Sequence, residues 1–179
     1  MHMAMQMRAW TLEEVHRLPD DGNKYELVRG ELFVTPAPTV DHETILARLT
    51  RVLEPYVAAH ALGLVYHPRA VLRLEGSEVE PDLMVRQPPA GKRVRWEKVP
   101  VPILVVEVLS PFTRRRDREQ KRAFYMDAGV AEYWIVDPDS GSVTVVRHGF
   151  DDATVRDELL WQPRSELPSL AVLLSDVFR

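Results

Sequence analysis

A single carboxylate, Glu107, interrupts the apolar stretch Ile103-Leu-Val-Val-Glu-Val-Leu109. An unbroken run of valine, leucine and isoleucine is typical of a strand that is covered on both faces. Side chains alternate along a strand, so Glu107 shares one apolar face with Ile103 and Leu109. Leaving an isolated charge there costs on the order of several kcal/mol, so Glu107 must be paired, protonated or bound to a metal ion. A salt bridge with an arginine would satisfy it equally well, and the sequence leaves both interpretations open.

A second carboxylate, Asp82, follows Pro81 near the start of another extended segment. Aspartate is disfavoured within strands, and at a strand start it is commonly a turn residue. An aspartate and a glutamate on neighbouring strands can nevertheless converge at one edge of a sheet, where they repel each other unless a cation lies between them. Ligation by oxygen alone suits Mg²⁺ or Mn²⁺, which would polarise a phosphoryl oxygen and lower the pKa of a bound water. Asp82 and Glu107 are therefore the candidate metal ligands.

The third candidate is Lys121, which recurs with Asp117, Tyr125 and Gly129 at intervals of four residues. This spacing places them on one stripe of a helix. On a solvated face, Asp117 and Lys121 would form a surface ion pair that stabilises the helix by roughly a few tenths of a kcal/mol. Directed toward the sheet, the Lys121 ammonium would instead orient an attacking water or stabilise developing negative charge. Spacing alone does not choose between the two arrangements.

The elements that must position these residues follow from the sequence pattern. Thr11 and Glu14 form a capping box at the start of a short helix, and Arg29-Gly30 separates two strands of a hairpin. A long helix is predicted from an N-cap at Asp41 to Gly63, with a kink or break at Pro55. A further helix is predicted over residues 115–128, ending at Gly129.

The remaining segments are predicted to form a sheet. Extended stretches span residues 65–74, 79–85, 102–109, 132–136 and 142–147, with a mobile loop over 86–98 and an apolar tail over 170–178 that docks on the body. This order of elements predicts an α/β protein, more specifically an α+β mixed sheet flanked by helices. We expect one domain over residues 1–179.

Composition narrows the possible functions. The chain has 179 residues, 45% of them hydrophobic and 28% charged, which is typical of a globular domain. With no cysteine, disulfides, thiolate catalysis and cysteine-type zinc sites are excluded. The formal net charge of −4 gives no overall basic field, so any nucleic-acid surface must be a local patch. Residues 1–10 do not resemble a signal peptide, and the apolar stretch 99–109 is too short for a membrane span, so a soluble, cytoplasmic protein is expected.

Several blocks of the sequence, in this order, resemble the Uma2 family of restriction-endonuclease-like proteins within the PD-(D/E)xK nuclease superfamily. The blocks are Tyr25-Glu-Leu-Val-Arg-Gly-Glu-Leu32, His42, Glu80-Pro-Asp-Leu-Met-Val85, Leu104-Val-Val-Glu-Val-Leu-Ser-Pro111, Asp117-Arg-Glu-Gln-Lys121 and Ala128-Gly-Val-Ala-Glu-Tyr-Trp-Ile-Val-Asp-Pro138. The resemblance spans nearly the whole chain.

The resemblance implies a restriction-endonuclease-like core and phosphodiester hydrolysis with a divalent metal ion. Asp82 and Glu107 would be the metal ligands and Lys121 the catalytic lysine. In the simple superfamily motif the lysine stands two residues after the acidic residue, and here that position is Leu109. The resemblance suggests that the lysine has migrated to Lys121, which preserves the chemistry only if its ammonium reaches the same point in space.

Two further residues within these blocks are accessory candidates. Glu26 would be an additional acid near the metal, although a hairpin carboxylate that faces solvent or pairs with an arginine fits the sequence equally well. His42, in the first turn of the long helix, would contact the scissile phosphate, or else act as a capping or packing residue.

Two short basic segments would supply a surface for nucleic acid. One lies in the predicted loop and includes Arg93 and Arg95; the other includes Arg114 and Arg115 at the start of the helix that carries Lys121. Both could collect backbone phosphates near the metal, although short basic runs are also common on solvated loops and helix starts.

The sequence thus favours a Mg²⁺- or Mn²⁺-dependent endonuclease that acts on DNA, and a homodimer would suit the cutting of two strands. The competing hypothesis is a catalytically inactive nuclease fold that binds nucleic acid or another protein. A glycosidase with paired carboxylates would need aromatic sugar platforms and a defined carboxyl separation, and nothing in the spacing selects it.

Overall fold

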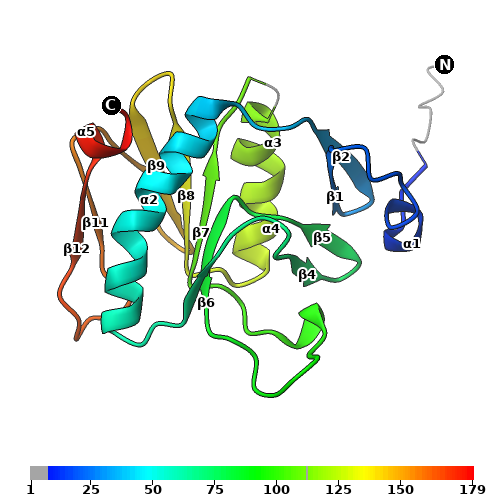
Figure 1. Ribbon diagram of the computed structural model, residues 1–179, viewed down its shortest axis with the longest axis horizontal. Coiled ribbons are helices and arrows are strands. Elements are labelled where there is room, and N and C mark those ends of the chain that lie inside the picture. The colour runs from blue at the N-terminus through cyan, green and yellow to red at the C-terminus, as the bar shows by residue number, and fades with distance from the viewer. Residues whose placement is uncertain (1–7, 112) are drawn as a thin grey trace.

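The computed structural model describes residues 8–111 and 113–179 (Figure 1). A central six-stranded sheet carries most of the core. Across the sheet its strands are β10 (Ala153–Val155), β9 (Ser142–Arg147), β8 (Glu132–Asp137), β7 (Leu104–Val108), β6 (Leu83–Arg86) and β3 (Leu64–Tyr66). Only β7 and β8 pair in parallel, and the other neighbours are antiparallel. The predicted α/β class with a mixed sheet is therefore confirmed.

Helices cover both faces of this sheet (Figure 1). The long helix α2 (Val40–Ala59) packs on the face formed by Leu83, Leu104 and Val106. The opposite face, which includes Val105, contacts the helical segment that links β7 to β8. That segment consists of α3 (Arg114–Arg116), a π-helical stretch η2 (Asp117–Lys121) and α4 (Arg122–Asp127). Covering β7 on both sides explains why its sequence is apolar throughout except at Glu107.

A second sheet of four strands lies beside the helical segment. Its order is β2 (Glu31–Thr35), β1 (Lys24–Val28), β5 (Ser77–Val79) and β4 (Leu72–Leu74). The predicted hairpin is confirmed as β1 and β2, and β1 also pairs with β5 through Leu27 and Glu78. This second pairing makes β1 an interior strand rather than one half of an exposed hairpin. Residues on β1 are consequently far more buried than an isolated hairpin would allow.

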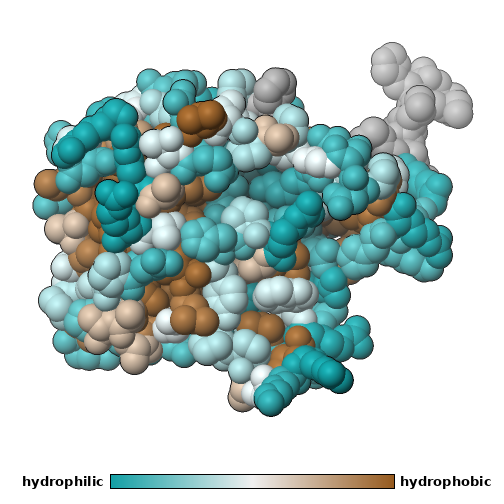
Figure 2. All heavy atoms as spheres, in the orientation of Figure 1, coloured by the Kyte–Doolittle hydropathy of each residue, from teal (hydrophilic) through white to brown (hydrophobic). Residues whose placement is uncertain are grey.

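The remaining elements complete the body. They are α1 (Leu12–Val15), the 3₁₀ turn η1 (Trp96–Lys98), a hairpin of β11 (Glu158–Trp161) and β12 (Leu170–Leu173), and α5 (Leu174–Val177). The capping box predicted for α1 is present, because Thr11 and Glu14 each accept from the other's backbone N–H. The apolar tail docks as predicted, with Val172, Leu174 and Val177 buried. The face of the molecule drawn in Figure 2 is mainly hydrophilic, with apolar side chains exposed in small groups.

The boundaries of α2 differ from the prediction in three ways. Its N-cap is Thr39 rather than Asp41, because the Thr39 side chain accepts a hydrogen bond from the backbone N–H of His42. The helix continues through Pro55 without a break, since buried residues on either side of the proline hold both halves against the sheet. It ends at Ala59, and Gly63 instead precedes β3.

Other segments were also divided differently. The extended stretch predicted over residues 65–74 forms two separate strands, β3 and β4, which belong to different sheets. No helix in the described part of the chain is long and apolar enough to cross a membrane. Residues 1–7, on which the expectation about a signal peptide partly rests, lie outside the described residues.

Gly63, just before β3, lies against the backbone of Arg86 at the end of β6. It has φ +115, and a Cβ at this position would overlap the carbonyl oxygen of Arg86. We expect Gly63→Ala to lower the free energy of unfolding by about 3 kcal/mol or more, because backbone strain and a steric clash add together. Gly149→Ala is the matched control, since φ there is +79 but nothing lies within 4 Å of the added Cβ. Equal urea midpoints for the two variants would contradict this expectation.

Candidate active site

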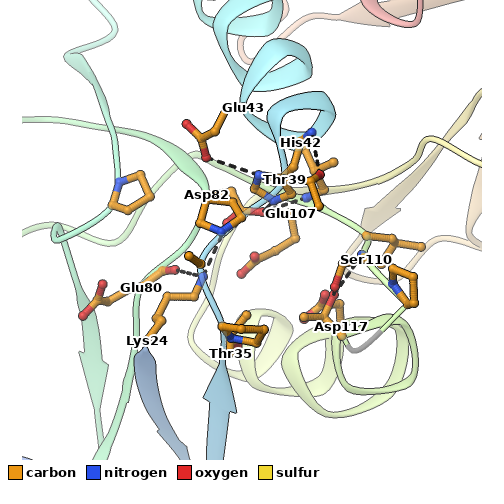
Figure 3. Close-up of a pocket in the computed structure, with 18 of the residues that line it drawn as sticks. Lys24, Thr35, Thr39, His42, Glu43, Glu80, Asp82, Glu107, Ser110 and Asp117 are labelled. Atoms are coloured by element: carbon orange, nitrogen blue, oxygen red, sulfur yellow. Dashed lines mark hydrogen bonds and ion pairs between the residues drawn. The ribbon is translucent and has the colours of Figure 1, made fainter. Parts of the chain in front are cut away.

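A cavity of about 540 Å³ opens between the N-terminus of α2, the start of β6 and the end of β7. Figure 3 shows side chains from all of these elements directed toward one another around it. Its lining includes the charged or ionisable residues Lys24, His42, Asp82, Glu107, Arg116 and Asp117.

The antiparallel pairing of β6 and β7 brings the two predicted metal ligands together. Leu83 lies opposite Val106, so Asp82, just before β6, reaches the end of β7 where Glu107 stands. The backbone N–H of Val108 donates to Asp82 Oδ2 at 2.9 Å. Asp82 is 5% exposed and Glu107 1% exposed, yet both line the cavity. Convergence of the two carboxylates at one sheet edge is thus observed as predicted.

Two basic side chains hold Asp82 in its charged form. Its Oδ1 lies 3.4 Å from Lys24 Nζ, and its Oδ2 lies 3.1 Å from His42 Nε2. Burial alone would raise the pKa of Asp82, but attraction to Lys24 and the hydrogen bond from His42 outweigh burial and hold that pKa well below its ordinary value. For His42, burial lowers the pKa and the contact with Asp82 raises it, with a net increase. The position of His42 in the first turn of α2 therefore places an imidazole, biased toward its cationic form, at the cavity.

Glu107 has the opposite electrostatic character. Its Oε1 accepts from Lys121 Nζ at 2.7 Å and from the Tyr125 hydroxyl at 2.5 Å. Burial raises the pKa of Glu107 to about 7; Lys121 lowers it, while the nearby charge of Asp82 raises it further. The carboxyl thus exchanges its proton near neutral pH, whereas that of Asp82 stays ionised.

Lys121 is directed toward the sheet and not toward solvent. Its ammonium lies 2.8 Å from Glu26 Oε1 as well as 2.7 Å from Glu107 Oε1, and 4.0 Å from Asp117 Oδ1. The wide π-helical turn η2 buries both Asp117 and Lys121, and Tyr125 on α4 is also buried. The solvated-face arrangement of this stripe is therefore not observed. Burial lowers the pKa of Lys121, but its carboxylate neighbours raise it more.

Glu26 is fully buried and does not face solvent. Its Oε1 accepts from Lys121 and from the backbone N–H of Glu80 at 2.9 Å, and its Oε2 lies 3.6 Å from Arg116 Nη1. The alternative prediction, that Glu26 faces solvent, is wrong because β1 is an interior strand. Glu26 nevertheless lies behind Lys121 rather than among the residues that line the cavity.

Two cationic residues at the cavity were not predicted from the sequence. Lys24 precedes Glu26 by two positions and thus shares its face of β1, a signal that the strand period already contained. Arg116 belongs to the basic run at the helix start, but it is only 8% exposed and contacts Asp117 at 3.2 Å. Nothing in the sequence separates Arg116 from its exposed neighbours, because its burial depends on tertiary contacts with Glu26 and Phe33.

The predicted nucleic-acid arginines are not gathered at the cavity. Arg114 is engaged by Asp137 and Asp139, while Arg115 is exposed and pairs with Glu119. Arg93 and Arg95 lie in the loop between the end of β6 and the start of β7, at the end of these strands opposite the carboxylates (Figure 1).

The site carries an excess of negative charge. Four carboxylates that are at most 5% exposed surround it, namely Glu26, Asp82, Glu107 and Asp117. Three permanent cations face them, Lys24, Arg116 and Lys121, and His42 adds a fourth positive charge only when it is protonated. Burial, and to a lesser extent the charge of Asp82, raise the pKa of Glu107, so a proton on Glu107 also reduces this excess. A proton or an added cation removes it.

The donor set fits a divalent cation of the Mg²⁺ type. Within residues 8–111 and 113–179, no group of three or more His, Asp or Glu side chains is arranged to hold a metal ion. Mg²⁺, however, commonly takes one or two carboxylates and completes its shell with water and substrate phosphate oxygens. Asp82 and Glu107 meet that requirement, since both are carboxylates that line the same cavity.

The chain as a whole is similar to known proteins. A family model named Uma2, described as "Putative restriction endonuclease", matches residues 12–177. A crystal structure described as "a putative nuclease belonging to DUF820", from Anabaena variabilis ATCC 29413, aligns with a TM-score of 0.74 over 94% of this chain and 97% of that one. The two sequences are 19% identical, so this likeness shows a shared fold. No curated protein matches the chain.

The raised pKa of Glu107 predicts a specific pH dependence of stability. Folded Glu107 keeps its proton up to about pH 7, whereas the ordinary value of 4.5 applies in the unfolded chain. The folded state therefore binds this proton more tightly, and the free energy of unfolding falls as pH rises between these two values. Glu107→Gln mimics the protonated form and retains an acceptor for Lys121 and Tyr125. We expect it to be more stable than the wild type by about 1–3 kcal/mol at about pH 8, with the difference disappearing near about pH 4.5. Urea titrations that give a constant difference across this range would contradict the assignment.

Proposed function

The chain belongs to the Uma2 family, and we propose that it is an endonuclease. It would hydrolyse phosphodiester bonds in DNA and depend on Mg²⁺ or Mn²⁺. The observation that carries the proposal is that two buried carboxylates, Asp82 and Glu107, line the same cavity. An isolated buried charge is costly, and a bound cation relieves that cost. Oxygen ligands favour a hard divalent cation over zinc or copper.

Asp82 and Glu107 are the residues that would hold the ion. When bound, it would polarise a phosphoryl oxygen and lower the pKa of a water molecule. Asp82 is already ionised and fixed by the backbone N–H of Val108, so its carboxylate needs no rearrangement. Glu107 must release its proton, which its pKa of about 7 permits near neutral pH.

Other residues of the cavity would bind and orient the phosphodiester. Hydrolysis forms a bond from a water oxygen to phosphorus and breaks the bond to a sugar oxygen, which then takes up a proton. Arg116 and His42 line the cavity, and their positive charge would attract the non-bridging phosphate oxygens. Lys121, which the family resemblance predicts as the catalytic lysine, fixes the orientation of Glu107 at 2.7 Å.

A homodimer would provide two such sites, which would suit the cutting of both strands of a duplex. The acidic lining of the cavity limits contact with DNA in the absence of added cations. This same feature favours the competing hypothesis, a binding module that retains the fold without turnover. In such a module, the buried ion pairs of Lys121 would serve only to stabilise the domain.

The nuclease assignment predicts metal-dependent cleavage that requires both carboxylates. We expect the wild type to nick DNA with Mg²⁺ or Mn²⁺, and Asp82→Asn to reduce the rate at least about 100-fold because one ligand to the cation is lost. Asp176→Asn removes an exposed carboxylate on α5 and is the matched control, with an unchanged rate expected. Absence of nicking across single-stranded, duplex and branched DNA and RNA would overturn the nuclease assignment.

Metal binding can be measured separately from cleavage. Mn²⁺ at about 100 times its dissociation constant is expected to raise the free energy of unfolding of the wild type by about 2.7 kcal/mol, because the ion binds only the folded state. Asp82→Asn should lose most of this increase, as followed by thermal unfolding with and without Mn²⁺. Stabilisation by Mn²⁺ without cleavage of any substrate would favour the binding module.

A further inference from the structure

The two lysines near the carboxylates occupy different environments. Lys121 is fully buried, and its Nζ lies within 2.8 Å of both Glu26 Oε1 and Glu107 Oε1. An ammonium group has three N–H donors, and two of them are directed at these oxygens. Among the described residues, those that line the cavity include Glu107 but not Lys121. Glu107 therefore stands between Lys121 and any molecule in the cavity.

Lys24 has the exposure that Lys121 lacks. It lies at the start of β1, lines the cavity, and its side chain is 18% exposed. Figure 3 shows it beside Asp82 and Glu80. Its Nζ donates to the backbone carbonyl of Glu80 at 3.0 Å and lies 3.4 Å from Asp82 Oδ1. These contacts account for two of its three N–H donors and leave one for a ligand in the cavity.

The Lys24 ammonium already contacts the carboxylate that would hold the cation, since its Nζ lies 3.4 Å from Asp82 Oδ1. A phosphate held by a cation at Asp82 would lie against this ammonium, because both contact the same carboxylate.

We propose that Lys24, and not Lys121, supplies the ammonium that contacts the reacting phosphate, and that Lys121 is a positioning residue for Glu107. This inference rests on the proposed nuclease function. Lys24 would donate to a non-bridging phosphoryl oxygen as negative charge develops there. Lys121 would act from behind, by holding Glu107 at the cavity floor.

A different role for Lys24 makes an opposite prediction. If Lys24 served only as a substitute cation for Asp82, a bound metal ion would replace it. Its removal would then tighten metal binding and leave the rate at saturating metal unchanged. The contrast between metal affinity and rate therefore distinguishes a catalytic Lys24 from a simple countercharge.

The central test compares Lys24→Met and Lys24→Arg with the wild type. Two measurements are made: the nicking rate at saturating Mn²⁺, and the affinity for thymidine 5′-monophosphate at saturating Mg²⁺ by calorimetry. We expect Lys24→Met to lower the rate about 100-fold or more and to weaken nucleotide binding about 10-fold, while Mn²⁺ affinity is unchanged or higher. Lys24→Arg should recover part of both losses because it restores the charge. A nicking rate of Lys24→Met within about twofold of the wild type would overturn the proposal.

Lys121 needs a variant that keeps the buried charges balanced. Lys121→Met alone leaves Glu26 and Glu107 without their shared cation and is expected to unfold the protein. The double variant Glu26→Gln/Lys121→Met removes one charge of each sign, and Tyr125 still donates to Glu107. A positioning role predicts a higher Mn²⁺ requirement with a loss of less than about tenfold in rate at saturating Mn²⁺. A loss at saturating Mn²⁺ as large as that of Lys24→Met, in a folded protein, would return the catalytic role to Lys121.

The two measurements separate failure of this inference from failure of the nuclease assignment. Cleavage by the wild type that Lys24→Met retains overturns the role of Lys24 and leaves the nuclease intact. Absence of cleavage, with nucleotide binding that Lys24→Met weakens, overturns the nuclease and keeps Lys24 as the phosphate contact. Absence of both cleavage and nucleotide binding overturns both.

Discussion

The burial of four carboxylates beside one cavity constrains the rest of this structure. Each of them must be neutralised by a cation, by hydrogen bonds or by a proton, because effective desolvation costs on the order of several kcal/mol per ion. The neutralising groups come from distant parts of the chain: Lys24 from β1, His42 from α2, and Lys121 from η2. The positions of β1, α2 and the helical segment relative to β7 are therefore tied together through charge as well as through apolar packing.

The π-helical stretch η2 is the local feature that this constraint requires. It lies between two α-helical segments, and it buries Asp117 and Lys121 in the same five residues. A π-helical turn is rare and is often found at functional sites. Here the Tyr133 hydroxyl donates to the backbone carbonyl of Asp117 at 3.1 Å, so β8 holds the widened turn in place. The turn directs the Lys121 ammonium at Glu107, the residue on which the predicted chemistry depends.

The sequence predicted what depends on strand period and composition. The apolar neighbours of Glu107 predicted its burial. The proximity of Glu107 and Asp82 was predicted by assuming that their two strands are neighbours in the sheet. The sequence could not show that β1 is an interior strand, because its pairing with β5 joins Leu27 to Glu78, which are distant in the chain. For this reason Glu26 remained ambiguous and Lys24 was overlooked. The direction of the helical stripe could not be predicted either, since its spacing fits a solvated face and a buried face equally.

Energetics argues that this arrangement is retained for function rather than stability. Replacing a buried ion pair by apolar side chains of similar volume is often neutral or stabilising, so the contacts among Glu26, Lys121 and Glu107 give the fold no necessary advantage. The raised pKa of Glu107 shows that its ionised form is a net burden at neutral pH. A domain selected for stability alone would lose such a carboxylate, whereas a site that binds a cation needs it. The desolvation cost of these buried carboxylates would favour the binding of a cation beside them, and this coupling links the buried charges to the proposed chemistry.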